Sequence, residues 1–379
     1  MALINYITQI QFEFGAISLL GQQCERVGIR RPLIVTDRGV KAAGIVDTVL
    51  GALAHAGTVA IYDGTPPNPN EATVREAVRA YKQGDCDGIV AVGGGSSIDL
   101  AKGVAVCATH DGPLSSFAMI EGGADRITSR TAPVIAVPTT AGTGSEVGRG
   151  AILILDDGRK VGVISPFVVP KVAICDPALT LGLPPALTAA TGMDAIAHCI
   201  ETFLSPAFNP PADGIALDGL QRAWRHIERA TRQGGDRDAR LNMMSASMQG
   251  ALAFQKGLGC VHSLSHSLGG IDPRLHHGTL NAIFLPAVIA FNEAAASVRD
   301  EDKLDRMAKV MGLAGGAEVG PSVRAMTERL GLPTGLAQLG VTRAMFPDII
   351  RGALKDHSHR SNPRVASETD YEAMLEASL

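Results

Sequence analysis

The segment TGMDAIAHCIE, residues 191–201, places an aspartate and a histidine in an otherwise apolar run. Asp194 and His198 are four residues apart, so on an α-helix their side chains share one face. His262 and His266 repeat this spacing in VHSLSHSLGG. A lone histidine in an apolar helix is more often a hydrogen-bonded core residue than a ligand, and an interhelical hydrogen bond is the alternative here. Two such pairs in one chain favour a metal site instead.

The chemistry of this site follows from the types of side chain. One carboxylate with several imidazoles and no thiolate suits Fe²⁺, Zn²⁺, Co²⁺ or Mn²⁺. A further imidazole is available from His276 or His277 in RLHHGTLNA, and the residues alone do not choose between them. Three or four such ligands would leave one position open for an alcohol or carbonyl oxygen, which the metal would activate as a Lewis acid.

A glycine-rich turn predicts a nucleotide site. In IVAVGGGSSIDLAKG, Gly93, Gly94 and Gly95 join an apolar run to a helical pattern, and Ser96 and Ser97 follow. Glycines allow the backbone to approach a ligand closely, and the free N–H groups at a helix start suit a pyrophosphate. The alternative is a tight strand-to-helix turn without a ligand.

Two further features favour a dinucleotide. PTTAGTGSEV, residues 138–147, is a second loop of small and hydroxyl-bearing residues, with Thr139, Thr140 and Thr143 in reach of phosphate or ribose. Asp37 ends the run LIVTD, where a carboxylate can accept from a ribose 2′-OH and would repel a 2′-phosphate. This favours NAD over NADP. The pattern is not GxGxxG, and Asp37 precedes the glycines, so a standard Rossmann fingerprint is absent.

The surrounding sequence predicts the elements that position these residues. Up to about residue 177, short β-branched runs alternate with helical patterns, which is typical of a mostly parallel α/β sheet. We expect strands at 32–37, 57–63, 87–93 and 132–138, and a hairpin that turns at Asp157-Gly158. From residue 178 to 379, helical periodicity dominates. The prediction is an α/β nucleotide-binding domain (1–177) and an all-helical metal domain (178–379), with the active site in the cleft between them.

Composition excludes several functions. The net charge is −4 and aromatic residues make up 4% of the chain, which offers little to a nucleic acid. No apolar run reaches the length of a membrane span. The six cysteines form no CxxC pair, and the first residues lack the pattern of a signal peptide. We therefore expect a cytoplasmic enzyme with a small-molecule substrate, and neither a nucleic-acid nor a membrane partner.

Five motifs occur in an order that resembles the iron-containing (group III) alcohol dehydrogenases: GGGSSIDLAKG, PTTAGTGSEV, GMDAIAHCIE, VHSLSHSLGG and HHGTLNAIFLP. The resemblance covers nearly the whole chain. It implies a Rossmann-like dinucleotide-binding domain followed by an all-α metal domain, an architecture shared with dehydroquinate synthase. It also implies NAD as cofactor, Fe²⁺ as the metal with Zn²⁺ as the second choice, and a homodimer or higher homo-oligomer.

The resemblance assigns roles to residues. The metal ligands it implies are Asp194, His198, His262 and the histidine before Gly278, which is His277. His266 is implied to lie near the nicotinamide as a proton relay. The implied cofactor contacts are Asp37, Asn68, Gly94, Gly95, Ser96, Ser97, Thr139, Thr140 and Thr143, although Asn68 in PPNPN equally suits a simple turn.

Within the family the chain is most similar to the bacterial NAD-dependent 4-hydroxybutyrate dehydrogenases, through phrases such as TGMDAIAHCIETFLSPAFNPPADGIALDG. This implies interconversion of 4-hydroxybutyrate and succinate semialdehyde. Ser267 departs from the family, where proline is more familiar, and this puts the preferred chain length of the substrate in doubt. A substrate carboxylate needs a cation, because a buried unpaired charge is costly. Arg149 is the first candidate, and the weaker ones are Lys160, Arg274, His357, His359 and Arg360.

Three alternatives remain at this point. The first is a dehydrogenase of the same type for a neutral alcohol, a diol or a lactaldehyde-type substrate. The second is a metal- and NAD-using lyase of the dehydroquinate synthase type, which would need more Lys and Arg residues near 194–280 than the chain has. The third is a non-catalytic protein that keeps the fold, and the intact set of metal-ligand candidates argues against it.

Overall fold

The computed structural model describes residues 8–53 and 59–379, and its contacts divide the chain into two compact units. One unit holds the described residues up to 140 together with 145–182. The other holds residues 141–144 and 183–379. Residues 141–144 lie in the second of the two predicted nucleotide loops, so this loop supplies residues to both units.

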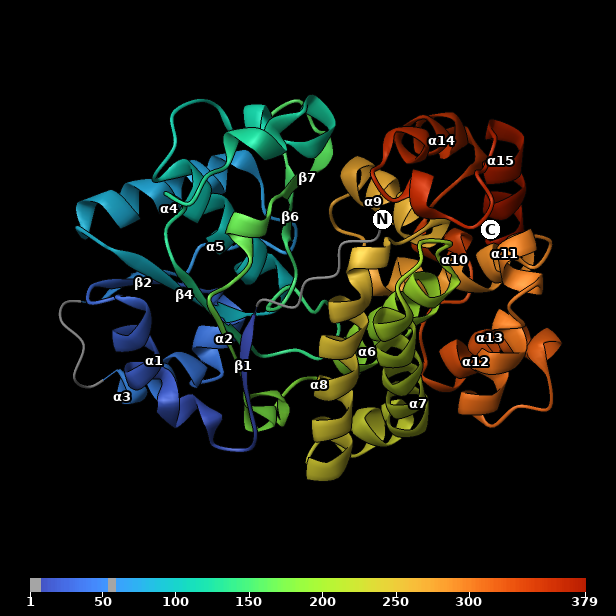
Figure 1. The fold of residues 1–379 in the computed structure, drawn as a ribbon, viewed down its shortest axis with the longest axis horizontal. Helices are drawn as coiled ribbons and strands as arrows, with labels where there is room; N and C mark the ends of the chain where they lie inside the picture. Colours follow the sequence, from blue (N-terminus) through green and yellow to red (C-terminus); the bar gives the residue numbers. More distant parts are fainter. Residues whose placement is uncertain (1–7, 54–58) are drawn as a thin grey trace. The chain divides into compact units, whose positions relative to one another are not determined.

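The first unit contains a six-stranded sheet in the order β1-β8-β5-β4-β2-β3, and all neighbouring strands are parallel (Figure 1). The strands are β1 (Gln9–Phe12), β2 (Pro32–Val35), β3 (Ala60–Tyr62), β4 (Gly88–Gly93), β5 (Val134–Pro138) and β8 (Val172–Cys175). Parallel strands are buried on both faces, which explains their continuous apolar runs.

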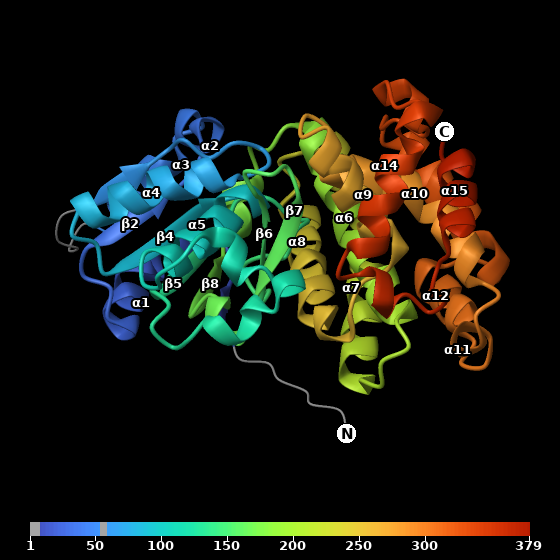
Figure 2. The same cartoon turned by 90° about the horizontal axis from the view of Figure 1, so that it is seen from above.

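Helices cover both faces of this sheet (Figure 2). Along β4, Ile89 and Ala91 pack with α4 (Glu71–Gln83) and α5 (Gly95–Cys107). Val90 and Val92 point to the other face and pack with α1 (Leu20–Val27) and α3 (Ile45–Ala52). Alternate side chains of one strand thus pack into the hydrophobic cores on the two faces of the sheet, because successive side chains point to opposite faces.

The order of the strands creates a switch point. From β2 the chain moves outward to β3 and then returns to β4 on the other side of β2. In open α/β sheets, ligands bind beyond the carboxyl ends of the strands at such a point. Asp37 follows β2, where it caps α2 (Arg38–Ala42), and Gly94 follows β4, so the predicted nucleotide residues lie at this position.

The expected α/β class and the hairpin are confirmed. Strands β6 (Gly150–Ile154) and β7 (Lys160–Ile164) pair antiparallel around Gly158, whose φ is +83°. Part of the strand expected at 57–63 lies outside the described residues, and β3 covers Ala60–Tyr62. Strand β1 at the edge of the sheet and its neighbour β8 were not predicted from the sequence.

The second unit is helical, as expected. Helices α6 and α7 pack against each other and against α8, α10 lies against α6, and α9 lies against α10 and α14. The helices are α6 (Pro185–Leu204), α7 (Pro210–Arg232), α8 (Arg237–Leu252), α9 (Cys260–Ile271), α10 (His277–Asn292), α11 (Ala296–Arg299), α12 (Lys303–Met311), α13 (Val319–Arg329), α14 (Phe346–Lys355) and α15 (Glu368–Ala377).

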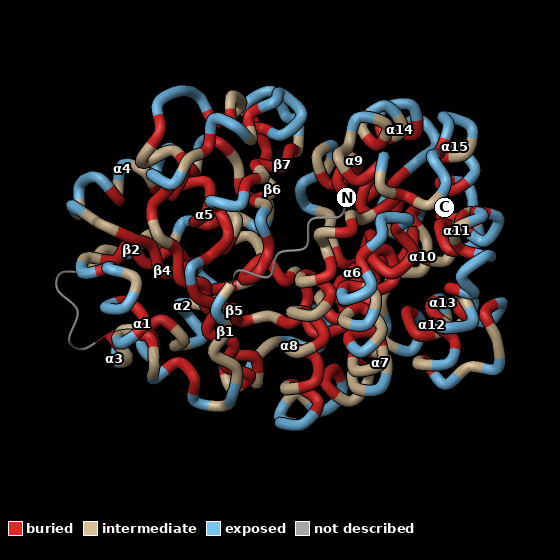
Figure 3. Tube along the Cα trace, in the orientation of Figure 1, coloured by how far each residue is buried: buried red, intermediate tan, exposed pale blue. Residues whose placement is uncertain are grey.

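Burial in this unit is deepest along α6 and α10 (Figure 3). Every residue of α6 from Gly192 to Leu204 is buried, including its charged members. Among the described helices, none combines the length and the hydropathy that crossing a membrane requires.

Candidate active site

One face of α6 carries three buried polar residues in an apolar helix. Asp194, His198 and Glu201 follow each other at steps of four and three residues, so they form a single stripe. Each is at most 5% exposed. Pro185 suits the first turn of this helix, where a missing N–H costs nothing. Burying this stripe requires partners, and α9 and α10 supply them.

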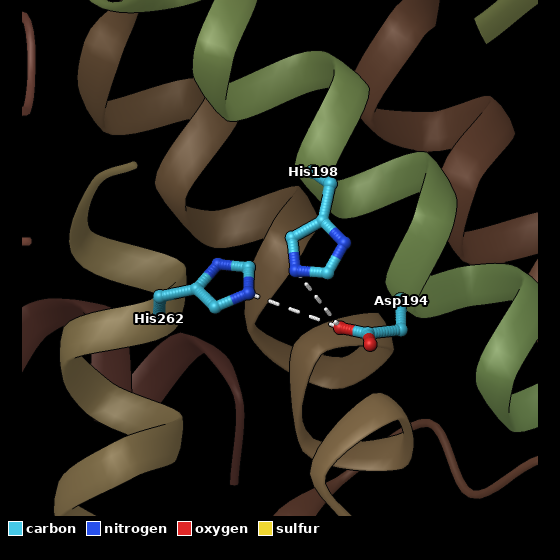
Figure 4. A group of neighbouring side chains, drawn as sticks. All are labelled: Asp194, His198 and His262. Atoms are coloured by element: carbon cyan, nitrogen blue, oxygen red, sulfur yellow. Dashed lines mark ion pairs between the residues drawn. The ribbon is translucent and has the colours of Figure 1, made fainter. Parts of the chain in front are cut away.

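Three imidazoles converge on the carboxylate of Asp194. The distances from Asp194 Oδ1 to the Nε2 atoms of His198, His277 and His262 are 3.6, 3.7 and 3.8 Å. Figure 4 shows His198 and His262, from different helices, both pointing their Nε2 atoms at this oxygen. Ligand atoms of a tetrahedral site with bonds of about 2.1 Å lie about 3.4 Å apart. The ligand atoms of Asp194, His198 and His262 all lie within 4.8 Å of one another, which fits a shared metal ion, and His277 is the fourth candidate by its distance to Asp194.

The chemistry of the donor set also fits a cation. The amide nitrogen of Asn281 lies 2.7 Å from Asp194 Oδ1, 3.1 Å from His277 Nε2 and 3.3 Å from His262 Nε2. An amide has two hydrogens, fewer than the acceptor atoms around it. A divalent cation is a better match for a carboxylate and several imidazole lone pairs.

The Nδ1 atoms of His262 and His198, on the ring edges that face away from Asp194, have polar partners of their own. His262 Nδ1 is in close hydrogen-bond contact with Glu201 Oε2, and Glu201 Oε1 accepts from the backbone N–H of Val261 at 2.8 Å. His198 Nδ1 faces the carbonyl oxygen of Gly142 at 3.2 Å. Such partners fix the ring orientation and direct Nε2 towards a metal.

Burial sets the protonation states of this group. It lowers the pKa of His198 to about 4 and that of His262 to about 3, although the charge of Asp194 opposes both shifts. Burial raises the pKa of Glu201 to about 8, against the hydrogen bond from Val261 and the nearby imidazoles. At neutral pH the two imidazoles are therefore uncharged and keep the lone pairs that a metal needs.

His266 lies beside the four ligand candidates. Its ring stacks on the ring of His277 with 5.2 Å between centroids, and its Nδ1 lies 3.0 Å from Asp356 Oδ2. Asp356 immediately follows α14, and it holds the Nδ1 edge of His266. Nearby, Ser267 Oγ donates to the carbonyl oxygen of Ile349 at 2.8 Å, a bond that a proline at 267 could not make. Two consecutive residues of α9 thus contact α14 and the residue that follows it.

The structure separates His276 from His277. His277 begins α10 and turns Nε2 towards Asp194, with its side chain 28% exposed. His276 precedes the helix and is exposed. Neighbouring residues at a helix start point in different directions, which the sequence of two adjacent histidines could not resolve.

In the first unit, the glycine turn is shaped by close contact. Gly93 has a φ of +148°, and a Cβ there would lie 2.6 Å from Ser97 Oγ. Ser97 Oγ donates to Asp37 Oδ2 at 3.4 Å, and Asp37 Oδ1 accepts from the N–H of Val40 at 2.9 Å. Asp37 therefore caps α2 and also faces the glycine turn.

The other cofactor candidates divide into two groups. Thr139 donates its N–H to the carbonyl oxygen of Gly93 at 3.0 Å, and a Cβ on Gly94 would lie 3.3 Å from Thr140. Ser96 hydrogen-bonds the carbonyl of Pro67, and Asn68 Oδ1 accepts from Lys160 Nζ at 3.0 Å. These residues and Gly95, the first residue of α5, belong to the first unit.

Thr143 belongs to the segment 141–144 of the second unit. Its neighbour Gly144 has a φ of +62°, and a Cβ there would lie 2.1 Å from Ala251 Cβ of α8. Only a glycine fits this contact, so the segment is held tightly against the helical unit.

A buried lysine that the sequence analysis did not single out anchors the same loop. Lys102 Nζ donates to Ser145 Oγ at 2.8 Å and to the carbonyl oxygens of Gly148 and Gly150 at 2.9 and 2.7 Å. Burial lowers its pKa to about 8, although Asp99 and Glu146 oppose this. Its spacing within SSIDLAKG gives no sign of this role, because its partners are more than 40 residues away.

Glu201, Asn281 and Asp356 were also missed. Glu201 lies at the end of the predicted helix segment, and its helical phase with Asp194 and His198 could have revealed it. Asn281 stands four residues after His277, which is likewise one helical turn. Asp356 lies 90 residues from His266, so no local pattern connects them.

The structure places the candidate carboxylate-binding cations as follows. Arg149 is exposed next to β6, in the first unit, and Lys160 of the same unit contacts Asn68. In the second unit, Arg274 is 88% exposed and paired with Asp272, and Arg360 is exposed. His359 Nδ1 lies 2.9 Å from Tyr371 Oη. His357 stacks on His266 with 5.5 Å between centroids.

Comparisons with known proteins agree with this architecture. Residues 8–177 match the family "Iron-containing alcohol dehydrogenase", and residues 188–379 match "Fe-containing alcohol dehydrogenase family, C-terminal". The 4-hydroxybutyrate dehydrogenase of Cupriavidus necator is 64% identical over 383 residues, covering 100% of both chains.

Solved structures give the same result. A 1,3-propanediol oxidoreductase superposes with a TM-score of 0.93 at 36% identity and covers 100% of both chains. The sulfoacetaldehyde reductase of Bifidobacterium kashiwanohense, solved with NAD⁺, gives a TM-score of 0.88 at 27% identity, covering 99% of this chain and 98% of that one. The matches include Asp194, His198, His262 and His277, the four ligand candidates, and the chain belongs to the iron-containing alcohol dehydrogenase family.

Proposed function

We propose that this chain interconverts 4-hydroxybutyrate and succinate semialdehyde with NAD, using a divalent metal that is Fe²⁺ in preference to Zn²⁺. Membership of the family supports a metal-dependent alcohol dehydrogenase. The identity of 64% over the full length to a 4-hydroxybutyrate dehydrogenase is the observation that carries the choice of substrate. The oxidoreductase named for 1,3-propanediol keeps a neutral diol as the alternative.

The metal would be held by Asp194, His198, His262 and His277. Their separations of 3.6 to 3.8 Å from a common oxygen support this assignment. When bound there, the ion lowers the pKa of an alcohol hydroxyl and stabilises negative charge on its oxygen. Glu201 and the carbonyl of Gly142 keep two of the rings in the orientation that this requires. The buried setting excludes water, which strengthens these interactions.

His266 is the candidate for carrying away the hydroxyl proton that the alcohol loses when it is oxidised. Its Nδ1 lies 3.0 Å from Asp356 Oδ2, so in the neutral ring the proton sits on Nδ1 and Nε2 is the basic atom. Burial alone would raise the pKa of Asp356, but His266 and His357 hold it well below its ordinary value. Asp356 therefore remains ionised and keeps His266 in one tautomer.

The cofactor would be bound by the glycine turn of the first unit. The position of Gly94 and Gly95 at the sheet's switch point, beside Asp37, supports a dinucleotide there. Ser96, Ser97, Thr139 and Thr140 frame this turn, and Asn68 and Thr143 complete the proposed set. NAD supplies the hydride acceptor at C4 of its nicotinamide. The carboxylate of Asp37 would disfavour the 2′-phosphate of NADP.

We also propose a homodimer in the cytoplasm. The dimer is proposed because twofold oligomers are the commonest assemblies. The cytoplasm is proposed because the six cysteines are free thiols in the structure, which suits a reducing compartment. Light scattering on the purified protein would test the assembly. Arg149, the first carboxylate-binding candidate from the sequence, is exposed in the first unit and stays the alternative to a cation of the second unit.

The test of the proposed reaction is NADH formation by Fe²⁺-loaded enzyme with 4-hydroxybutyrate, 1,4-butanediol or 1,2-propanediol. We expect kcat/KM for the hydroxy acid to exceed that for either diol by at least about tenfold, because a matched charge is lost with the diols. Asp194→Asn should remove bound metal and activity, whereas Asp218→Asn, an exposed aspartate of α7, should change neither. A higher kcat/KM for a diol would contradict the proposed hydroxy-acid substrate. Absence of turnover with all three alcohols, with metal bound, would contradict the proposed reaction.

A further inference from the structure

Three imidazoles form a stack that leads away from the metal-ligand candidates. His266 stacks on His277 with 5.2 Å between centroids and an interplanar angle of 10°. His357 stacks on His266 with 5.5 Å between centroids and an angle of 22°. His357 is thus joined to the proposed ligand His277 by two ring-to-ring steps, and its role in the function proposed above is limited to keeping Asp356 ionised.

His357 is held so that it can present a positive charge. Its Nδ1 lies 3.5 Å from Asp356 Oδ2, while its Nε2 makes no hydrogen bond with any residue that the structure describes. Burial lowers the pKa of His357, but the charge of Asp356 and its hydrogen bond to the ring together outweigh burial and raise the pKa above its ordinary value. The side chain is 21% exposed, so a solute can reach it. A protonated ring in this setting offers Nε2–H as a charge-assisted donor.

The other cations considered in this unit are committed elsewhere. Arg274 is paired with Asp272 at 2.7 Å on the surface, and buried Lys256 is paired with Asp213. His359 contacts Tyr371, and burial lowers its pKa, so it carries no charge at neutral pH. Among the described residues of the second unit, His357 is the one of these groups that touches the histidine cluster.

We propose that His357 binds the carboxylate of the substrate and thereby selects a hydroxy acid over a neutral alcohol. This inference rests on the proposed function. The hydroxyl and carboxylate oxygens of an extended four-carbon hydroxy acid lie about 6 Å apart by ordinary bond lengths. The two ring-to-ring steps from His277 to His357 are 5.2 and 5.5 Å. A hydroxyl held at the Asp194 cluster, about 6 Å of extended chain and a hydrogen bond of about 3 Å are together long enough to span these two steps.

The test compares 4-hydroxybutyrate with 1,4-butanediol, a neutral alcohol of the same length, in the metal-loaded enzyme. His357→Gln should lower the ratio of kcat/KM for the acid to that for the diol by about 10- to 100-fold, because one charged hydrogen bond is lost. The loss should lie in KM for the acid. His357→Arg should recover part of the ratio. His357→Met, which also lacks the charge, provides the same comparison if His357→Gln does not fold.

Binding of butyrate, which cannot react, supplies a second measurement. Its affinity for the holoenzyme with NAD⁺, measured by calorimetry, should weaken in His357→Gln by a similar factor. Arg360→Gln, which removes an exposed cation three residues away, is the matched control and should leave both measurements unchanged. A parallel fall with acid and diol, or an unchanged ratio, would overturn the role of His357. A wild-type enzyme without preference for the acid would overturn the proposed substrate as well, so the two failures are distinguishable.

Discussion

Glu201 decides how His262 faces the proposed metal position. It contacts His262 Nδ1 through one carboxylate oxygen and takes the N–H of Val261 through the other. The ring of His262 is therefore held at one edge by α6 while its other edge points at Asp194, also on α6. A carboxylate behind a ligating histidine makes the imidazole a stronger ligand and fixes its tautomer.

Glu201→Gln tests this role at the scale of one residue. We expect metal affinity to fall by about 10- to 100-fold, because the amide cannot orient and polarise His262 as the carboxylate does. Metal-free protein should unfold at nearly the same temperature at neutral pH. The raised pKa of about 8 means that the metal-free folded state already favours the neutral carboxyl, which glutamine imitates. Metal titration and thermal unfolding measure the two effects.

The control is Glu228→Gln, which changes a surface ion pair of α7 with Arg329. It should leave metal affinity unchanged, because exposed pairs contribute little. If Glu201→Gln bound metal as tightly as the wild type, the contact with His262 would be a packing feature without influence on the site.

At the scale of elements, the turn between β4 and α5 depends on one backbone conformation. Gly93 adopts a φ of +148° and leaves room for Ser97, which in turn reaches Asp37. Gly93→Ala should weaken NADH binding by about tenfold or more, since the methyl would displace Ser97 and the turn around it. The strained backbone should lower the free energy of unfolding by about 1–3 kcal/mol. Fluorescence titration and urea unfolding are the measurements.

Gly158→Ala is the matched control. Its φ of +83° also disfavours alanine, but a Cβ there would meet open space at the tip of the hairpin. It should cost about 1–2 kcal/mol of stability and leave NADH affinity unchanged. Equal NADH affinities in the two variants would mean that the geometry at Gly93 does not govern cofactor binding.

The elements also show what the sequence could predict. Strands β2, β4 and β5 lie inside the sheet, and their continuous apolar runs predict burial on both faces. The missed strand β1, QIQF, alternates with glutamine because it pairs on one side with β8. The missed β8 has four residues between a lysine and an aspartate, too few to form a clear pattern. The edge strand β1 thus carries less of the burial on which sequence patterns depend, whereas β8 is buried but too short to be recognised.

The same distinction holds for the site. Asp194 with His198 and His262 with His266 were predictable because helical spacing places each pair on one face. Asp356 was not, because its contact with His266 is created by the packing of α9 against α14. Lys102 was not, because its partners lie in a loop that only the fold brings back to α5. Local periodicity reveals which residues share a face, and tertiary packing decides what they meet.

At the scale of the whole molecule, the residues proposed to bind the metal and most of those proposed to bind the dinucleotide belong to different units. The proposed metal ligands all lie in residues 183–379, and the glycine turn of β4 and α5 lies in the other unit. Thr143 is the one proposed cofactor contact that shares a unit with the metal ligands. Binding of the dinucleotide should therefore depend mainly on residues that no metal ligand touches.

Removal of the metal by a chelator tests this separation. Activity should be lost, because no residue of the chain can replace the charge that the ion places on the alcohol oxygen. NADH affinity should stay within about twofold, since sites without shared partners usually act additively. Fe²⁺ should restore activity and Mg²⁺ should not, because imidazole ligands suit the first and not the second. A fall in NADH affinity of about tenfold or more would mean that the metal organises the cofactor site, and Thr143 in the segment beside Gly142 would then be the connection to examine first.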